Sequence, residues 1–197
     1  HIIKGKDDLD LETPKENSPL FQKVQNTLIG SNSLCLNEIH RLCKKKKIES
    51  KIWFKDIDED VIKLSEWFVK KISKINLSNP LLLISGGETT VRIKGKGKGG
   101  RNQEFALHFI KKMNKKYPLL KFFLLSAGTD GRDGPTDAAG GIVNYKSIEK
   151  IKLKKLKIDK ELGENNSYEV LKKINSLVII KGTNTNVADI QLLMLVK

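Results

Sequence analysis

Three short segments of this 197-residue chain combine glycines with charged or hydroxyl side chains, and each follows an apolar run. They are residues 85–90 (SGGETT), 95–101 (GKGKGGR) and 128–140 (GTDGRDGPTDAAG). Glycine lets a backbone approach a bound group closely, carboxylates can hold a cation or accept a proton, and arginine can hold an anion. Each segment alone could be an ordinary turn. Because ligands gather at the carboxyl ends of strands in α/β sheets, the three together predict one shared site.

The first segment offers two glycines and a carboxylate. Gly86 and Gly87 would let the backbone approach a bound group, with Glu88 beside them. Glutamate is usually exposed, so Glu88 could equally be a surface charge or a helix-cap partner.

The second segment is rich in glycine at a strand-to-helix junction. Gly95, Gly97 and Gly100 have the G-x-G-x-x-G spacing of dinucleotide-binding loops. That match is weak, because residues 89–94 look like part of a hairpin and no acidic residue follows at the required place. We instead expect free backbone N–H groups at the helix start, which favour an anion such as phosphate.

Arg101 follows these glycines and is the strongest single candidate. With Lys96 and Lys98 it would add positive charge to the anion site. A guanidinium can hold two oxygens at once and stabilise the charge that develops during phosphoryl transfer. The alternative is an ordinary ion pair with Glu104 or Glu88.

The third segment places Asp130, Asp133 and Asp137 within eight residues. Such density is repulsive unless a cation or an arginine neutralises it. Magnesium prefers oxygen ligands and is the natural candidate, and one carboxylate could act as a general base. Asx-turns are the alternative explanation for some of these aspartates. The spacing does not match a calcium-binding loop.

The apolar pattern predicts a layered α/β fold around these segments. Residues 1–78 contain a β-α-β-α succession, with helical stripes at 34–45 and 61–72 and a strand at 51–54 after the apolar run 27–29. We expect a second unit over residues 79–197. Its predicted strands are 81–84, 89–94, 122–125, 177–180 and 192–196, and its main helix is 102–115.

Composition narrows the class of protein. The net charge is +14, from 37 Lys and Arg against 23 Asp and Glu, but only four of the basic residues are arginine and aromatics make up 6%. Arginine and stacking aromatics are what nucleic-acid binders use, so we expect scattered surface lysines and no nucleic-acid partner. No apolar run is long enough to span a bilayer and no signal-peptide pattern is present, so we expect a cytoplasmic protein and leave an organellar location open.

Cysteines and histidines indicate no disulfide and no zinc site. Cys35 and Cys43 lie eight residues apart in one predicted helix, a rise of about 12 Å, which no disulfide can bridge. The histidines are His1, His40 and His108, and none forms a metal-ligand pattern.

Four motifs together resemble the MOFRL domain of type-2 glycerate kinases. They are residues 85–90, 97–104, 126–140 and 183–189, in that order. Residues 26–32 and the helix after them resemble the end of the family's N-terminal, Rossmann-like domain. The expected fold is therefore a partial Rossmann-like N-terminal segment followed by a mixed-sheet MOFRL domain, over 1–78 and 79–197.

The resemblance implies ATP-dependent phosphorylation of D-glycerate at its 2-hydroxyl, with Mg²⁺, in a cleft between two domains. It implies that Arg101, Asp130 and Asp137 face that cleft. From the motifs and the loop chemistry together, the candidate catalytic residues are Arg101, Asp130 and Asp137; the candidate cofactor-binding residues are Gly86, Gly87, Glu88, Gly97, Gly99, Gly100, Asn102 and Thr129; the candidate metal ligands are Asp130 and Asp133.

Two departures from the family pattern affect function. Residues 180–189 read IKGTNTNVAD, whereas relatives usually carry TGPTGTNVND. The chain begins with His1, and most of the family's N-terminal domain is not in it, so we expect the C-terminal part of a longer enzyme that could be inactive alone. Its expected partners are D-glycerate, the missing domain in cis or trans, and a second copy in a homodimer.

Two other functions stay open. One is reduction of hydroxypyruvate with a nicotinamide cofactor, although no histidine lies in the glycine segments to assist hydride transfer. The other is a non-catalytic binding domain.

Overall fold

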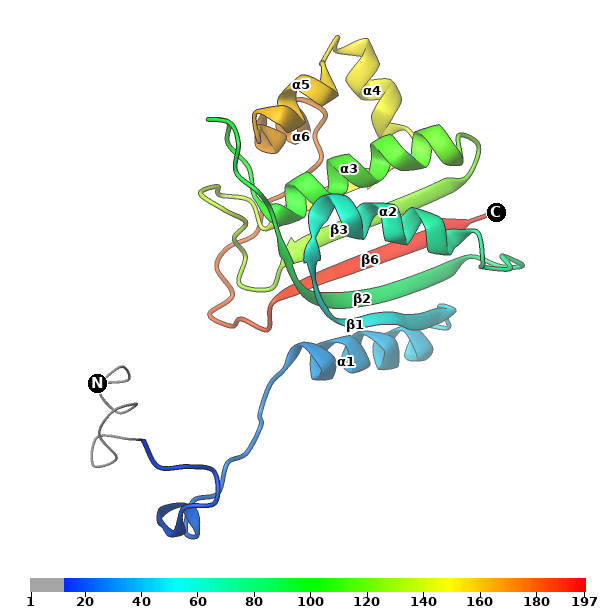
Figure 1. The fold of residues 1–197 in the computed structure, drawn as a ribbon. Helices are drawn as coiled ribbons and strands as arrows, with labels where there is room; N and C mark the ends of the chain where they lie inside the picture. Colours follow the sequence, from blue (N-terminus) through cyan, green and yellow to red (C-terminus); the bar gives the residue numbers. More distant parts are fainter. Residues whose placement is uncertain (1–12) are drawn as a thin grey trace.

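The computed structural model describes residues 13–197 (Figure 1); the beginning of the predicted N-terminal segment, residues 1–12, lies outside the described residues. The helices are η3 (Pro19–Phe21), α1 (Asn32–Lys45), α2 (Val61–Ile72), α3 (Arg101–Lys116), α4 (Ser147–Leu153), α5 (Ile158–Gly163) and α6 (Ser167–Lys173). The strands are β1 (Ser50–Asp60), β2 (Leu81–Thr90), β3 (Lys121–Gly128), β4 (Gly140–Asn144), β5 (Leu177–Val178) and β6 (Asp189–Val196).

The six strands form one mixed sheet in the order β1-β2-β6-β3-β4-β5. β1 and β2 are parallel, and the other neighbours are antiparallel. The last strand of the chain, β6, therefore lies between β2 and β3, with Asp189 opposite both Gly87 and Gly128. The predicted layered α/β fold with a mixed sheet is confirmed.

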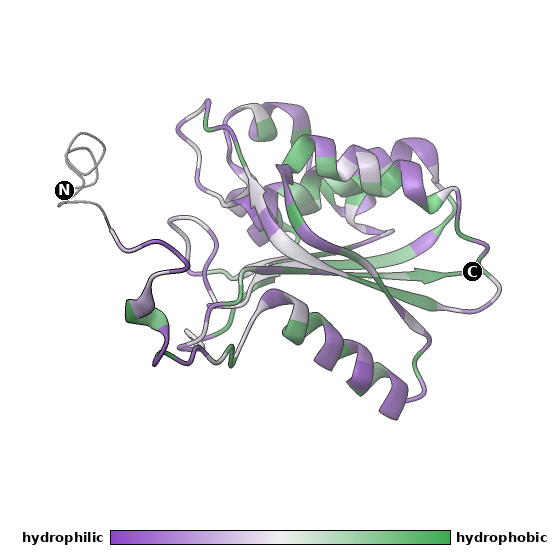
Figure 2. Cartoon of the chain, turned by 60° about the horizontal axis from the view of Figure 1, so that its bottom comes forward, coloured by the Kyte–Doolittle hydropathy of each residue, from purple (hydrophilic) through white to green (hydrophobic). Residues whose placement is uncertain are grey.

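Helices cover both faces of this sheet (Figure 1). α1 packs beneath β1, β2 and β6, while α2 and α3 pack against each other on the opposite face, together with the shorter helices α4 to α6. In Figure 2 the hydrophobic residues concentrate in the strands and on the helix sides that face them. Among residues 13–197, none of the helices has both the length and the apolar character needed to cross a bilayer.

Local sequence explains the main helices. α1 begins after Ser31, whose hydroxyl accepts a hydrogen bond from the N–H of Leu34 at 3.2 Å, and it buries Leu36 and Cys43 against the sheet. α2 has Asp60 as its N-cap. Both cysteines are free, as expected from their spacing.

The structure corrects the prediction for residues 85–94. Residues 85–90 are not a loop but the end of β2, and no separate strand follows at 89–94; residues 27–29 are not in a strand either. The glycines serve close packing within the protein. A Cβ on Gly87, which has φ of +144°, would lie 2.2 Å from the backbone N of Ile57, and a Cβ on Gly86 would lie 2.4 Å from the Asn32 side chain.

The predicted boundary near residue 78 falls between α2 and β2. The sheet and the core both continue across this point, because β1 pairs with β2 and the ring of Phe68 in α2 lies 5.3 Å from that of Phe105 in α3, between centroids. The division of the chain at this point stays a prediction.

Candidate functional site

Arg101 is held by two carboxylates at one end of the sheet. It is the first residue of α3, and its Nε and Nη2 donate to the two oxygens of Asp189 at 2.7 and 3.1 Å. Its Nη1 lies 2.8 Å from Glu88 Oε1. The strand order brings these residues together, because β6 begins at Asp189 beside the last residues of β2. Three distant segments thus meet at one guanidinium.

The two ion pairs differ in exposure. Asp189 is fully buried, whereas the side chains of Glu88 and Arg101 are 63% and 34% exposed. The hydrogen bond with Asp189, more than any other contact, raises the pKa of Arg101, and Glu88 adds a smaller electrostatic contribution. Arg101 is therefore a fixed positive charge with one side toward the protein and one toward solvent.

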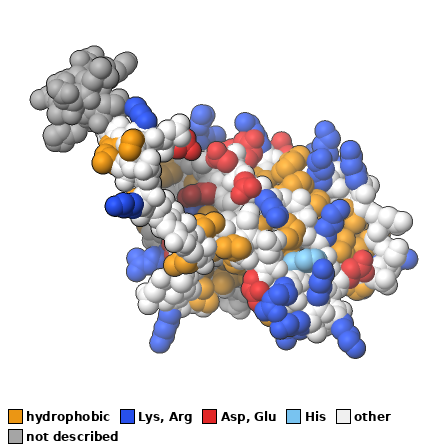
Figure 3. Space-filling model, turned by 90° about the horizontal axis from the view of Figure 1, so that it is seen from below, with side chains coloured by type: hydrophobic (Ala, Val, Ile, Leu, Met, Phe, Trp, Pro, Cys, Tyr) orange, Lys and Arg blue, Asp and Glu red, His pale blue; other side chains and the backbone are white. Residues whose placement is uncertain are grey.

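A hollow of about 520 Å³ opens beside Arg101. It is lined by Asp58, Glu88, Thr89, Thr90, Val91 and Arg101. The hydroxyl of Thr89 is buried and has no hydrogen-bond partner within residues 13–197. Figure 3 shows acidic side chains gathered at the end of the molecule from which residues 13–31 extend, beside a hollow.

Asp130 lies close to the Arg101 pair. A Cβ built on Gly128 would be 3.0 Å from Asp130 Oδ1 and 3.6 Å from Asp189 Oδ1, so both carboxylates approach the same point. Asp130 Oδ1 accepts a hydrogen bond from the N–H of Arg132 at 2.9 Å. Asp130 therefore forms an Asx-turn, the alternative to metal binding that the sequence left open. The structure therefore brings Glu88 and Arg101 of the predicted site together, and it places Asp130 near Asp189, the other partner of Arg101.

Asp133 has a structural role at the start of α3. Its two oxygens accept the backbone N–H groups of Asn102 and Gln103 at 3.1 and 2.9 Å, and Oδ1 also accepts from the Asn102 side chain at 3.3 Å. Burial raises the pKa of Asp133 above its ordinary value, and these hydrogen bonds offset part of that rise. Asn102 is itself buried and accepts from Ser126 at 2.6 Å. Neither side chain faces the hollow at Arg101 as a lining residue.

The expectation of free N–H groups in the glycine segment is wrong for Gly97 and Lys98 and for the second and third residues of α3. The N–H of Gly97 donates to the carbonyl of Glu164 at 2.7 Å, that of Lys98 donates to Asn166 Oδ1 at 3.2 Å, and the first turn of α3 is capped by Asp133. A Cβ on Gly99 or Gly100 would lie 2.1 or 2.3 Å from protein atoms. These glycines permit close packing between segments, and binding of a cofactor by Gly97, Gly99 and Gly100 stays a prediction without geometric support.

Thr129 and Asp137 make contacts of another kind. The Thr129 hydroxyl donates to the carbonyl of Ala188 at 2.7 Å and accepts from the N–H of Val187 at 2.9 Å, so it fixes the segment before Asp189. Asp137 is exposed and accepts from Tyr168 at 2.7 Å. That hydrogen bond lowers the pKa of Asp137. Thr129 therefore supports the site indirectly, and Asp137 lies with α6 rather than with Arg101.

Asp189 is the residue of the Arg101 cluster that sequence reasoning did not single out. It lies 88 residues from Arg101, so no local pattern connects them. The available signal was its place at the end of the 183–189 motif, directly before the final apolar strand.

The carboxylates do not form a cage for magnesium. Within residues 13–197, no three His, Cys, Asp or Glu side chains converge as metal ligands. Asp133 is committed to α3 and Asp189 to Arg101. Asp130 is not among the residues that line the Arg101 hollow, and magnesium binding by Asp130 and Asp133 stays a prediction.

Known proteins resemble this chain over most of its length. It is 37% identical over 196 residues to glycerate 2-kinase of Pyrococcus horikoshii, covering 96% of this chain and 43% of that protein. It is 36% identical over 184 residues to D-glycerate 2-kinase of Thermotoga maritima, covering 91% and 42%. The chain thus spans less than half the length of these relatives.

A solved structure confirms the fold, and a family model covers the residues of the candidate site. The crystal structure of glycerate kinase from Thermotoga maritima superposes with a TM-score of 0.80 and 36% identity, covering 87% of this chain and 42% of that one. The MOFRL family model matches residues 81–189, which include Glu88, Arg101, Asp130 and Asp189. This chain belongs to the MOFRL family.

Proposed function

We propose that this chain carries part of the active site of a glycerate 2-kinase, which transfers the terminal phosphoryl group of ATP to the 2-hydroxyl of D-glycerate. The observation that carries the proposal is the similarity to two glycerate 2-kinases over more than nine-tenths of the chain. The Arg101 cluster supports it, because phosphoryl transfer needs mainly positioning and stabilisation of negative charge.

Arg101 would contact the transferring phosphoryl group. Asp189 and Glu88 hold the guanidinium in one orientation, so little reorganisation is needed when negative charge develops. Thr89 and Asp130 are the neighbouring polar groups, and Asp130 could accept the proton of the substrate hydroxyl.

The charges around Arg101 favour a nucleotide that arrives with a cation. Asp58 and Glu88 line the same hollow, so a free polyphosphate would meet two carboxylates there. Mg²⁺ bound to the phosphates would reduce that repulsion, with Asp130 as the candidate protein ligand.

A further region is proposed to complete the site. The similar enzymes are more than twice as long as this chain, and the hollow at Arg101 is open to solvent on one side. The remaining part of such an enzyme, in the same polypeptide or in another chain, would close it. A homodimer stays a prediction.

The test is ADP release from ATP with Mg²⁺ and D-glycerate, by this chain combined with the remaining part of the enzyme in the same polypeptide or in another chain, with the product identified by ³¹P NMR. We expect 2-phosphoglycerate as the product and a loss of about 10²-fold or more in kcat for Arg101→Ala. Arg41→Ala is the matched control, because Arg41 pairs with Glu38 on α1. Oxidation of NADPH by hydroxypyruvate without ADP release would instead support the reductase, and neither reaction would support a binding domain.

A further inference from the structure

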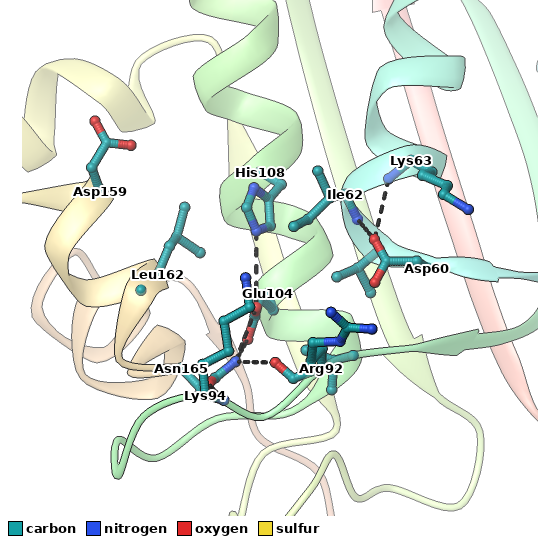
Figure 4. Close-up of a pocket in the computed structure, with 13 residues that line it drawn as sticks. Asp60, Ile62, Lys63, Arg92, Lys94, Glu104, His108, Asp159, Leu162 and Asn165 are labelled. Atoms are coloured by element: carbon teal, nitrogen blue, oxygen red, sulfur yellow. Dashed lines mark hydrogen bonds and ion pairs between the residues drawn. The ribbon is translucent and has the colours of Figure 1, made fainter.

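A second hollow, of about 480 Å³, is drawn in Figure 4, and it shares the lining residue Val91 with the hollow at Arg101. It is formed by the start of α2, the segment after β2, α3 and α5. Val91 lines both hollows, so they adjoin at the end of β2. Together they make one extended surface built from several parts of the chain.

Residues of α3 connect the two hollows. Arg101, Glu104 and His108 are spaced by three and four residues, which places them on one side of the helix. The rise from Arg101 to His108 is about 10 Å. A ligand with one end at Arg101 and the other at His108 would therefore be elongated.

The floor of the second hollow is polar and fixed in position. Asn165 donates to both oxygens of the buried Glu104 at 3.2 and 3.1 Å, and His108 Nε2 lies 3.9 Å from Glu104 Oε1. Asn165 Oδ1 in turn accepts the N–H of Lys94 at 2.6 Å. Figure 4 shows Glu104, His108 and Asn165 lying close together, connected by these contacts.

The rest of the lining combines apolar residues with charges of both signs, including the carboxylates of Asp60 and Asp159. Ile62 and Val91 contribute apolar surface, and Arg92 and Lys94 add positive charge on the segment that leads from the first hollow. Cavities of this size that are apolar with a few fixed polar groups are typical of small-molecule sites. A three-carbon acid such as glycerate has no apolar part to occupy such walls.

We propose that the second hollow binds the nucleoside part of a nucleoside triphosphate whose terminal phosphate lies at Arg101. The apolar residues would contact the base, His108 would offer a hydrogen bond beside the fixed Glu104 and Asn165, and Arg92 and Lys94 would lie near the inner phosphates. This inference rests on the proposed function, since that function places the terminal phosphate.

The test compares ATP with inorganic triphosphate. Each is titrated into the full chain with Mg²⁺ by calorimetry. The dissociation constant of triphosphate divided by that of ATP measures the contribution of the nucleoside. We expect ATP to bind at least about tenfold more tightly than triphosphate. Equal affinities, or no binding of ATP at millimolar concentration, would overturn the proposal.

A filled hollow should remove that preference. Ile62 lines only the second hollow and is 37% exposed, so Ile62→Trp adds bulk there with little effect on the core. Ile93→Trp is the matched control, because Ile93 is 78% exposed and lines neither hollow. We expect Ile62→Trp to lower the ratio about tenfold without changing triphosphate affinity, and Ile93→Trp to leave it unchanged. An unchanged ratio in Ile62→Trp, or an equal fall in both, would refute the proposal.

Two further measurements keep the outcomes separate. Adenosine alone should shift the backbone NMR signals of Val91 and His108 even if Ile62→Trp fails to fold, and shifts confined to other surfaces would contradict the proposal. Triphosphate affinity in Arg101→Ala tests the proposed function by itself. If that affinity is unchanged, Arg101 is not the phosphate contact, whereas the ATP preference still reports on the second hollow.

Discussion

The ion pair between Arg101 and Asp189 should contribute measurably to folding as well as to the site. Asp189 is fully buried, so removing its partner leaves an uncompensated carboxylate inside the protein. Breaking a buried pair costs about 3–5 kcal/mol, but the Arg101 side chain is 34% exposed and solvent screens part of that effect. We therefore expect Arg101→Ala to lower the free energy of unfolding by about 2–3 kcal/mol.

A double-mutant cycle separates the pair from its surroundings. Arg101→Ala, Asp189→Asn and the double variant would be unfolded in urea at pH 7, with the fluorescence of Trp53 and Trp67 as the signal. We expect a coupling free energy of about 1–3 kcal/mol. Glu88→Gln is the comparison, because the exposed Glu88 should contribute about 0–1 kcal/mol. A coupling below about 0.5 kcal/mol, or a larger loss in Glu88→Gln than in Asp189→Asn, would refute the reasoning.

Two more predictions concern the third glycine segment. Asp133→Ala removes the cap of α3 and leaves the buried N–H groups of Asn102 and Gln103 unpaired, so urea unfolding should show a loss of about 2–4 kcal/mol, and a loss below about 1 kcal/mol would contradict this role. The hydrogen bond from Tyr168 lowers the pKa of Asp137 below its ordinary value of 3.8. The ionised Asp137 therefore stabilises the folded protein above pH 3.8, and this stabilisation is lost as the pH falls through the lower pKa of the folded state. Tyr168→Phe should return that pKa toward 3.8 in an NMR titration of the carboxyl group, and an unchanged titration would exclude the hydrogen bond as the cause.

Helices α1, α2 and α3 were predictable from sequence because their signals are local. The apolar spacing of α1 and α2 and the available cap at Ser31 lie within a few residues of each helix. β2 was misread at Gly86 and Gly87, since glycine pairs usually mark turns. Their pairing with β6, about 100 residues later, keeps them in the strand, and a local pattern cannot show that partner.

The site was predictable in part for the same reason. Arg101 and Glu88 stood out by type and position, and their ion pair was one of the expected alternatives. Asp189 did not, because its partner is 88 residues away. The acidic density of residues 130–137 suggested a metal, yet each aspartate has a separate protein partner: Asp130 bonds the Arg132 N–H, Asp133 caps α3, and Asp137 bonds Tyr168.

The site has the opposite charge to the rest of the protein. The chain carries a formal charge of +14, yet three carboxylates, those of Asp58, Glu88 and Asp189, contact the Arg101 guanidinium or line its hollow. Scattered lysines can attract a nucleotide over a distance, and salt weakens that attraction. At the Arg101 hollow, the carboxylates repel a polyphosphate without a bound cation and favour one that carries a cation. The affinity for triphosphate should therefore change more when Mg²⁺ is removed than when the salt concentration is raised.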